Sequence, residues 1–344
     1  MKEIIGKLVE GRSLTIDEMT TAMRLVMGGE ATPTQIGGFL TALRLKGETM
    51  EEIYGAALVM REKATRVCLG MKGLLDTCGT GGDGKQTFNI STAAAFVVAA
   101  AGAPVAKHGN RAVSSSCGSA DVLEALGVQV DLRPEQVEKC VEEVGIGFLF
   151  APLFHTAMKY ALGPRKELGF RTVFNLLGPL TNPAGAEIQL LGVFNEKLAP
   201  VLAWVLARLG LKRALVVYGG GGIDELSLSG VNHLCEVKDG KVEASYTLTP
   251  EEVGLTKASL EEIRGGDPTE NAVYIRRVFQ GEKGPRRDVI ILNSAAALYA
   301  AGRAESIASG VRIAAEMIDS GQALGKLEAL ANYSTQLKEN AACI

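Results

Sequence analysis

The sequence predicts an α/β protein with a small all-helical N-terminal domain and a large domain built on a central, mostly parallel sheet flanked by helices. Residues 1 to about 65 carry apolar residues at helical spacing and no strand signal. From about residue 70, short apolar segments alternate with glycine-rich loops and helical segments, which is typical of a buried parallel sheet. We therefore expect a helical domain at 1–68, an α/β domain at 69–344, and a segment near 155–185 that returns to the helical part.

Three capping-box patterns predict helix starts in the N-terminal domain. Thr15, Thr32 and Thr49 are each followed three residues later by Glu or Gln, and both side chains of such a pair can satisfy free N–H groups at a helix start. Apolar residues at helical spacing follow each start. We expect about four helices here, and either simple packing or a subunit interface as their role.

The larger domain is expected to repeat strand–loop–helix units. Ligands of such sheets bind beyond the carboxyl ends of the strands, so the loops at 76–92, 107–119 and 219–225 are expected to converge. A hairpin around Asp239-Gly240, within 234–258, is expected to have no catalytic duty. Strands are predicted at 74–75, 102–106, 128–132, 146–150, 214–218 and 288–292, and helices at 93–101, 120–126, 134–144, 201–209 and 295–300.

The loop at 76–92 predicts a phosphate or pyrophosphate site. Four glycines at 79, 81, 82 and 84 let backbone N–H groups approach a ligand closely. Asn89, Ser91 and Thr92 stand where the next helix begins, and the free N–H groups and dipole of a helix start favour an anion.

Two commoner motifs overlap this loop. The spacing G-x-G-x-x-G occurs, but the helix starts late, and Lys107 stands where a dinucleotide-binding unit would carry an acidic residue. The spacing G-x-x-x-x-G-K also occurs, but Gln86 follows it where a P-loop needs Ser or Thr. A tight turn without a ligand is a further alternative, which the density of glycines disfavours.

Three other segments carry candidate site residues. Lys107 to Arg111 offers two cations and a glycine after a strand, which favours phosphate contact, while His108 fits a structural role at least as well. Asp224-Glu225 on a glycine loop suits Mg²⁺, which takes a few carboxylates together with water and phosphate oxygens. Arg165 carries a guanidinium, the best planar partner for a carboxylate.

Composition excludes several classes of protein. A net charge of −3 argues against a general nucleic-acid binder. No run of about 18 apolar residues predicts a membrane span, and the N-terminus lacks a signal-peptide core. Six cysteines without C-x-x-C spacing indicate structural thiols in a reducing cytosol and make a zinc site improbable.

Five segments together closely resemble the anthranilate phosphoribosyltransferase family of tryptophan biosynthesis. The resemblance covers essentially the whole chain, and it depends on the combination, because each segment alone is common. The segments are Gly79–Asp83, Asn89–Thr92, Lys107–Arg111, Arg171–Pro183 and Asp224-Glu225.

The resemblance implies the fold of class II nucleoside phosphorylases and a defined reaction. Ribose 5-phosphate passes from phosphoribosyl pyrophosphate to the amine of anthranilate, giving N-(5-phosphoribosyl)anthranilate and pyrophosphate. It further implies a pair of Mg²⁺ ions per subunit and a cytoplasmic homodimer joined through the helical domain, without nucleic-acid or membrane partners. Two alternatives stay open at this point, a pyrimidine-nucleoside phosphorylase and a non-enzymatic nucleic-acid-binding relative on the same fold.

The same resemblance assigns residues to the substrates. Anthranilate would contact Gly79, Asn110 and Arg165, and Mg²⁺ would bind Ser91, Asp224 and Glu225. No single catalytic acid or base is assigned. The contacts to the phosphoribosyl donor would be Gly79, Gly82, Asp83, Thr87, Asn89, Ile90, Ser91, Thr92, Lys107, His108, Gly109, Asn110, Arg111, Ala112, Val113, Ser114, Ser115 and Ser119.

Overall fold

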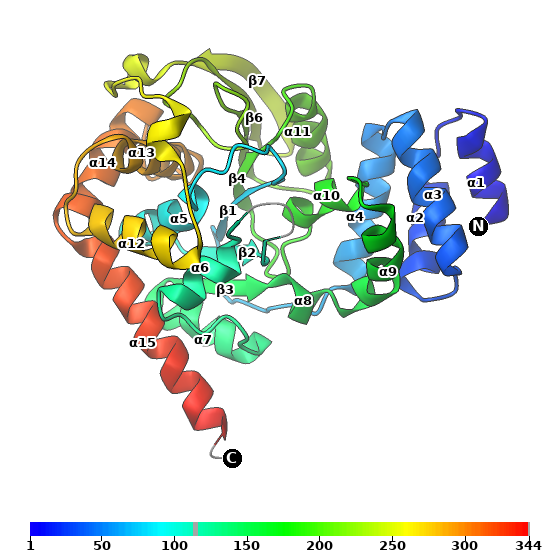
Figure 1. The fold of residues 1–344 in the computed structure, drawn as a ribbon, viewed down its shortest axis with the longest axis horizontal. Coiled ribbons are helices and arrows are strands. Elements are labelled where there is room, and N and C mark those ends of the chain that lie inside the picture. The colour runs from blue at the N-terminus through cyan, green and yellow to red at the C-terminus, as the bar shows by residue number, and fades with distance from the viewer. Residues whose placement is uncertain (113–115, 343–344) are drawn as a thin grey trace.

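The N-terminal part of the chain is a bundle of helices, as predicted. The computed structural model describes residues 1–112 and 116–342 (Figure 1). At each predicted start, the Thr15, Thr32 or Thr49 hydroxyl accepts from the third backbone N–H of its helix, and the capping boxes are complete. The helices are α1 (Lys2–Val9), α2 (Ile16–Met27), α3 (Pro33–Lys46) and α4 (Met50–Lys63).

A single seven-stranded sheet forms the centre of the larger part, in the order β3-β2-β1-β4-β5-β6-β7. The first five strands in that order run parallel, and the β6–β7 hairpin is added antiparallel at one edge, as the Asp239-Gly240 turn predicts. The strands are β1 (Leu75–Gly79), β2 (Val105–Gly109), β3 (Ile146–Phe150), β4 (Ile188–Gly192), β5 (Arg213–Tyr218), β6 (Asn232–Lys238) and β7 (Lys241–Leu248).

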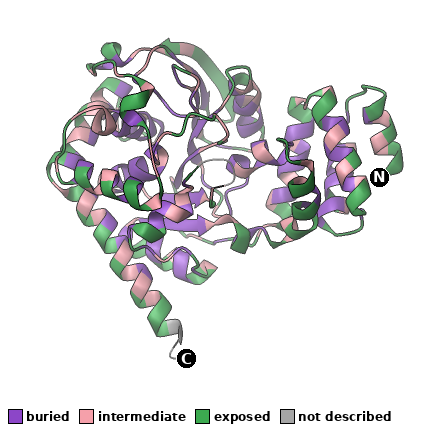
Figure 2. Ribbon diagram, viewed as in Figure 1, coloured by how far each residue is buried: buried purple, intermediate pink, exposed green. Residues whose placement is uncertain are grey.

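Helices cover both faces of the sheet. α5 and α13 pack on one face, against β1, β4 and β5. α11 packs on the other face and also contacts α4 of the helical domain, while α15 runs past the sheet to the C-terminus (Figure 1). Figure 2 shows the parallel strands buried between these layers, whereas the edge strand β7 is largely exposed. The helices are α5 (Ile90–Ala100), α6 (Ser119–Ala125), α7 (Pro134–Val144), α11 (Leu198–Arg208), α12 (Pro268–Phe279), α13 (Pro285–Ala300), α14 (Ile307–Asp319) and α15 (Gln322–Ala342).

Two predicted strands are wrong. Residues 288–292, together with the helix predicted at 295–300, form the continuous helix α13. Its Val289–Leu292 run is buried throughout, and periodicity alone cannot separate a buried strand from a buried helix. Residues 128–132 form no regular element and pair with no strand. Gln129 N–H donates to Ser334 Oγ of α15, and the alternating apolar residues are buried in the core.

Other elements were missed or shifted. The central strand β4 was not predicted, because Gln189 interrupts its apolar run. β2 begins and ends about three residues later than the predicted 102–106, which places Lys107 and His108 inside the strand instead of on a loop. Their side chains are consequently buried.

The segment after β3 packs beside the helical domain (Figure 1). α9 contacts α2 and α3, and α10 contacts α4. Arg61 of α4 donates from Nε to the Leu180 carbonyl at 2.7 Å. The short elements along the chain are α8 (Ala151–Phe154), η1 (Thr156–Met158), α9 (Lys159–Leu168), α10 (Phe174–Leu177), η2 (Gly178–Leu180), η3 (Pro250–Val253) and η4 (Leu260–Ile263).

None of the helices in the described ranges is both long enough and apolar enough to cross a membrane.

Candidate functional site

The candidate site lies where the strand order changes direction. β1 is hydrogen-bonded to β2 on one side and to β4 on the other, and the chain continues outward to β3 and to β5. Such a switch point opens a crevice beyond the carboxyl ends of the strands. The glycine-rich loop leaves β1 there, and the 219–225 loop leaves β5.

Carboxylates from the 219–225 loop contact the glycine-rich loop directly. Gly81 N–H donates to Asp224 Oδ2 at 2.6 Å, and Asp224 N–H donates to Asp83 Oδ2 at 3.4 Å. Ser91 N–H at the start of α5 donates to Glu225 Oε1 at 3.1 Å. A side chain at Gly79 would overlap the Asp224 carboxylate, so this approach requires a glycine. Two of the three loops predicted to converge, 76–92 and 219–225, are therefore in contact.

The electrostatics of these acids fit a bound cation. Burial, then Glu225 and Asp83, raise the pKa of Asp224 well above its ordinary value. Burial raises the pKa of Glu225 to about 7, against the opposing charge of Lys107. In the described part of the chain no three His, Cys, Asp or Glu side chains are arranged to hold a metal alone. Two carboxylates with Ser91 fit Mg²⁺, whose remaining ligands are usually water and substrate phosphate oxygens.

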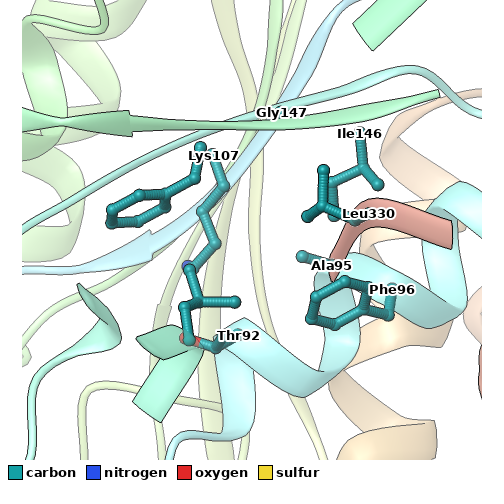
Figure 3. A pocket seen from close by; sticks show the side chains of 9 residues that line it. Thr92, Ala95, Phe96, Lys107, Ile146, Gly147 and Leu330 are labelled. Atoms are coloured by element: carbon teal, nitrogen blue, oxygen red, sulfur yellow. The ribbon is translucent and has the colours of Figure 1, made fainter. Parts of the chain in front are cut away.

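Lys107 supplies positive charge from β2, next to β1, from which the glycine-rich loop leaves. Its side chain is 3% exposed and runs from β2 toward Thr92 of α5 (Figure 3), and its ammonium donates to the Thr77 carbonyl of β1. Its methylenes line a cavity of about 10 Å³, too small for a substrate. Asp76 lies on the neighbouring strand, and burial raises its pKa to about 6 while Lys107 opposes the rise. Lys107 therefore acts on this edge of the sheet mainly through its field.

The start of α5 lies next to the glycine-rich loop. Ile90 and Thr92 have buried side chains, so they could reach a donor only through their N–H groups. Thr87 pairs with Arg264 in an isolated antiparallel bridge. The Asn89 side chain is directed to Cys117, whose carbonyl accepts from Asn89 Nδ2 at 3.2 Å.

The residues of the loop after β2 differ in what they contact. The Asn110 carbonyl accepts from Ser119 Oγ at 3.2 Å, which closes the loop around Gly109, while the Asn110 side chain is exposed. The Arg111 guanidinium is paired with Asp121 at 2.9 Å and Glu124 at 2.6 Å, so its charge is already compensated by the protein. Ala112 N–H donates to Asp121 Oδ2 at 2.9 Å. Val113, Ser114 and Ser115 lie outside the described residues.

His108 forms a buried pair with His155. Their ring centroids lie 5.0 Å apart, and among the described residues neither Nε2 atom has a hydrogen-bond partner. Burial lowers the pKa of His108 to about 3 and that of His155 to about 4, and the neighbouring ring adds to the shift of His108. Both rings are therefore neutral at pH 7.

Arg165 lies on α9, in the segment that packs on the helical domain. Its guanidinium lies 5.2 Å from the Phe174 ring centroid, and burial lowers its pKa. Within the described ranges no carboxylate pairs with it. A partly buried guanidinium without an anion is suited to a carboxylate ligand.

A third segment, 264–271, was missed by the sequence reasoning. It crosses the glycine-rich loop: Gly265 N–H donates to the Gln86 carbonyl at 2.8 Å. Asn271 Nδ2 donates to Asn89 Oδ1 at 3.0 Å, and Asn271 Oδ1 accepts from Gly266 N–H at 2.8 Å. We name residues 264–271 the strap. Its glycine pair, Gly265-Gly266, was the available signal, but spacing alone does not show which loop it touches.

A second hollow, of about 340 Å³, lies away from this crevice. It is formed by the β7 end, η3 and the start of α14, with Tyr246, Tyr299 and Ile307 in its wall. None of the predicted site residues lines it.

Comparisons with known proteins agree with this architecture. Residues 2–64 match the model of the glycosyl transferase family helical bundle domain, and residues 71–324 match that of the glycosyl transferase family a/b domain. The anthranilate phosphoribosyltransferase of Acetivibrio thermocellus is 56% identical over 97% of this chain and 96% of its own. That of Pelotomaculum thermopropionicum is 56% identical over 98% and 97%.

Solved structures are also similar over almost their whole length. The anthranilate phosphoribosyltransferase of Thermus thermophilus has a TM-score of 0.91 at 50% identity, covering 96% of this chain and 99% of its own. The Saccharomyces cerevisiae enzyme in complex with PRPP and Mg has a TM-score of 0.90 at 30% identity, covering 97% of both chains.

Proposed function

The chain belongs to the family of anthranilate phosphoribosyltransferases, and from this premise we propose that it transfers ribose 5-phosphate from phosphoribosyl pyrophosphate to the amine of anthranilate in tryptophan biosynthesis. It is a pentosyl transferase of the glycosyl transferase family. The observation that carries the proposal is the contact of Gly81 with Asp224 at the switch point, beside the start of α5. Amide donors and carboxylates meet there, as an anionic donor with a divalent cation requires.

The donor site comprises the glycine-rich loop, the start of α5 and the loop after β2. The phosphates would lie along residues 79–92 and 109–112, with Ser119 beside them, although the Gly81, Ser91 and Ala112 N–H groups already donate to carboxylates of the protein. Lys107 contributes through its field, and Asn89 positions the loop by its bonds to Cys117 and Asn271. Arg111, already paired with two acids, contributes its main chain.

Ser91, Asp224 and Glu225 would hold Mg²⁺ in this site, and we expect a pair of ions per subunit. The cation supplies neutralising charge to the pyrophosphate. The yeast relative solved with PRPP and Mg supports this choice. The Gly81 and Ser91 amides donate to Asp224 and Glu225, so a cation held by these carboxylates would lie beside the glycine-rich loop and the start of α5.

The acceptor binds on the side of the helical domain. Arg165 holds the anthranilate carboxylate, with Asn110 and Gly79 beside the ring. The buried His108 is neutral at pH 7, so it is not available as an imidazolium general acid. An aromatic amine is neutral at pH 7, so no catalytic base is required. The protein lowers the barrier mainly by orienting the amine and by stabilising charge as the ribose carbon becomes oxocarbenium-like.

Anthranilate fluorescence provides the direct test. We expect it to fall when the protein, phosphoribosyl pyrophosphate and Mg²⁺ are mixed. The double variant Asp224→Asn with Glu225→Gln should abolish the Mg²⁺-dependent loss. A wild-type protein that leaves anthranilate unchanged, or that releases bases from pyrimidine nucleosides in phosphate, would refute the proposal and favour the phosphorylase alternative.

Assembly and location are part of the same proposal. Most large exposed hydrophobic side chains lie on the helical domain or on the segment packed beside it, for example Val9, Leu45 and Leu162. We place the homodimer interface on this part. The cysteines at 78, 140 and 235 are buried free thiols, which suits the reducing cytoplasm.

A further inference from the structure

Arg171 places an exposed guanidinium against the glycine-rich loop. A Cβ atom at Gly82 would lie 2.9 Å from Arg171 Nε and 3.0 Å from both Cζ and Nη2. Gly82 also has a φ of +76°, which L side chains rarely adopt. The guanidinium therefore fills the space that a side chain at position 82 would take, directly beside the backbone proposed to hold the donor.

An aromatic ring holds this guanidinium in place. Arg171 Cζ lies 4.4 Å from the centroid of the Phe194 ring, within the range of a cation–π contact. Phe194 follows β4, and its N–H donates to Thr80 Oγ1 of the glycine-rich loop at 3.2 Å. The cation is thus fixed between the loops that leave β1 and β4, the two strands that flank the switch point.

The charge of Arg171 is not compensated by the protein. In the described part of the chain it has no carboxylate partner, whereas Arg111 has two. The bound yeast donor is a polyanion, and a guanidinium matches phosphate oxygens with two parallel N–H groups. Arg171 also comes from the segment packed beside the helical domain, so it brings charge to the donor from that side of the crevice.

We propose that Arg171 is a further donor-binding residue, whose guanidinium binds the pyrophosphate group beside Gly82. This inference rests on the proposed function, which places the donor on the glycine-rich loop. The alternative is a purely structural role, in which the cation–π contact with Phe194 only stiffens the loops.

Binding of inorganic pyrophosphate separates the two roles without requiring turnover. The variants are Arg171→Gln, Arg171→Lys and the control Arg312→Gln, which removes the same charge from an exposed position on α14. Calorimetric titration of each full-length protein with pyrophosphate and Mg²⁺ should show affinity about tenfold weaker for Arg171→Gln, the loss expected for one hydrogen bond to a charged group. Arg171→Lys should lose about threefold, because the ammonium keeps the charge but not the planar pair of donors. The control should bind as the wild type does.

Steady-state kinetics then show which substrate the Arg171 substitution affects. KM for phosphoribosyl pyrophosphate should rise in Arg171→Gln while KM for anthranilate stays unchanged. Unaltered pyrophosphate affinity, or a rise confined to anthranilate, would overturn the inference. If Arg171→Gln does not fold, the same titration of Arg171→Lys, which keeps the charge, tests the inference through its loss of pyrophosphate affinity. A wild type that binds pyrophosphate but does not consume anthranilate would refute the proposed function alone.

Discussion

Position, more than residue type, determines what single residues do in this crevice. Asp224 and Glu225 are ordinary acids in the sequence, but the folded chain brings their oxygens to the Gly81 and Ser91 amides. Arg111 and Arg165 have the same side chain, yet Arg111 is paired with two acids and Arg165 is partly buried beside Phe174. The pairing state therefore supports our proposal that Arg165, and not Arg111, binds the carboxylate of the acceptor.

Replacing Arg165 should impair use of anthranilate. We expect Arg165→Gln to raise KM for anthranilate by about 10- to 100-fold, because a hydrogen bond to a charged group is lost in a partly buried place. KM for phosphoribosyl pyrophosphate should stay within about twofold, because in our proposal Arg165 makes no hydrogen bond to the donor. The neighbouring exposed Lys166→Gln on α9 is the matched control for steady-state kinetics. Equal losses for both substrates in Arg165→Gln would contradict the assignment.

The buried histidine pair should make stability depend on pH. The pKa of His155 falls from 6.5 to about 4 on folding, so between these values only the unfolded chain binds a proton. The contribution of His155 to the free energy of unfolding is complete above pH 6.5. It is lost as the pH falls below this value, at about 1.4 kcal/mol per pH unit. The raised pKa values of Asp76 and Glu225 act in the opposite direction, so the wild-type curve alone does not isolate His155.

Comparison with His155→Gln isolates this contribution. Between about pH 7.5 and about pH 5, the wild type should lose about 2 kcal/mol of unfolding free energy relative to the variant. Urea unfolding at several pH values measures the difference. Parallel curves for the two proteins would show that His155 titrates normally in the folded state.

At the scale of elements, the strap explains how the glycine-rich loop keeps its shape. The loop spans exposed positions such as Gly84 and Lys85, yet the strap bonds to the Gln86 carbonyl and to Asn89. Local sequence predicts the turn from its glycines, but not a partner segment that is distant in the chain. The same limit explains why β4 and α13 were missed or misassigned, since both are recognised only by what they pack against.

Loosening the strap should weaken the donor site. Asn271→Ala leaves Gly266 N–H without its acceptor and removes one of the donors to Asn89 Oδ1, a cost of about 1–3 kcal/mol. We expect lower stability and a KM for phosphoribosyl pyrophosphate raised more than that for anthranilate. Val273→Ala, at a position 40% exposed on the same helix, is the control for thermal unfolding and kinetics. Unchanged donor KM in Asn271→Ala would limit the strap to a structural role.

At the scale of the whole molecule, the helical bundle has large apolar side chains that its own core does not bury. Leu45 on α3 is 83% exposed and Val9 on α1 is 73% exposed, and these helices pack against each other. These exposed apolar side chains are the basis on which we propose a subunit interface on this part of the molecule. The surface is separate from the crevice, so the two can be tested independently.

A charge at Leu45 should disrupt the proposed dimer. Leu45→Glu is expected to shift the mass in solution from twice 36.2 kDa toward 36.2 kDa, because the carboxylate would have to be buried in the interface. Light scattering after size-exclusion chromatography measures the change. Val242→Glu, at an exposed position on β7, should leave the mass unaltered. A wild type that is already monomeric would contradict the proposed assembly.

Local patterns in the sequence were sufficient for features whose physics is local. Capping at Thr15, Thr32 and Thr49 and the hairpin turn at Asp239-Gly240 depend on residues a few positions apart. The prediction that the glycine-rich loop binds an anion likewise depends on neighbouring residues. Only the tertiary structure decided that Lys107 is buried in β2, that Asn271 anchors Asn89 and that Arg171 reaches Gly82. These contacts join distant segments, and they form because the parallel sheet brings the ends of its strands to one edge.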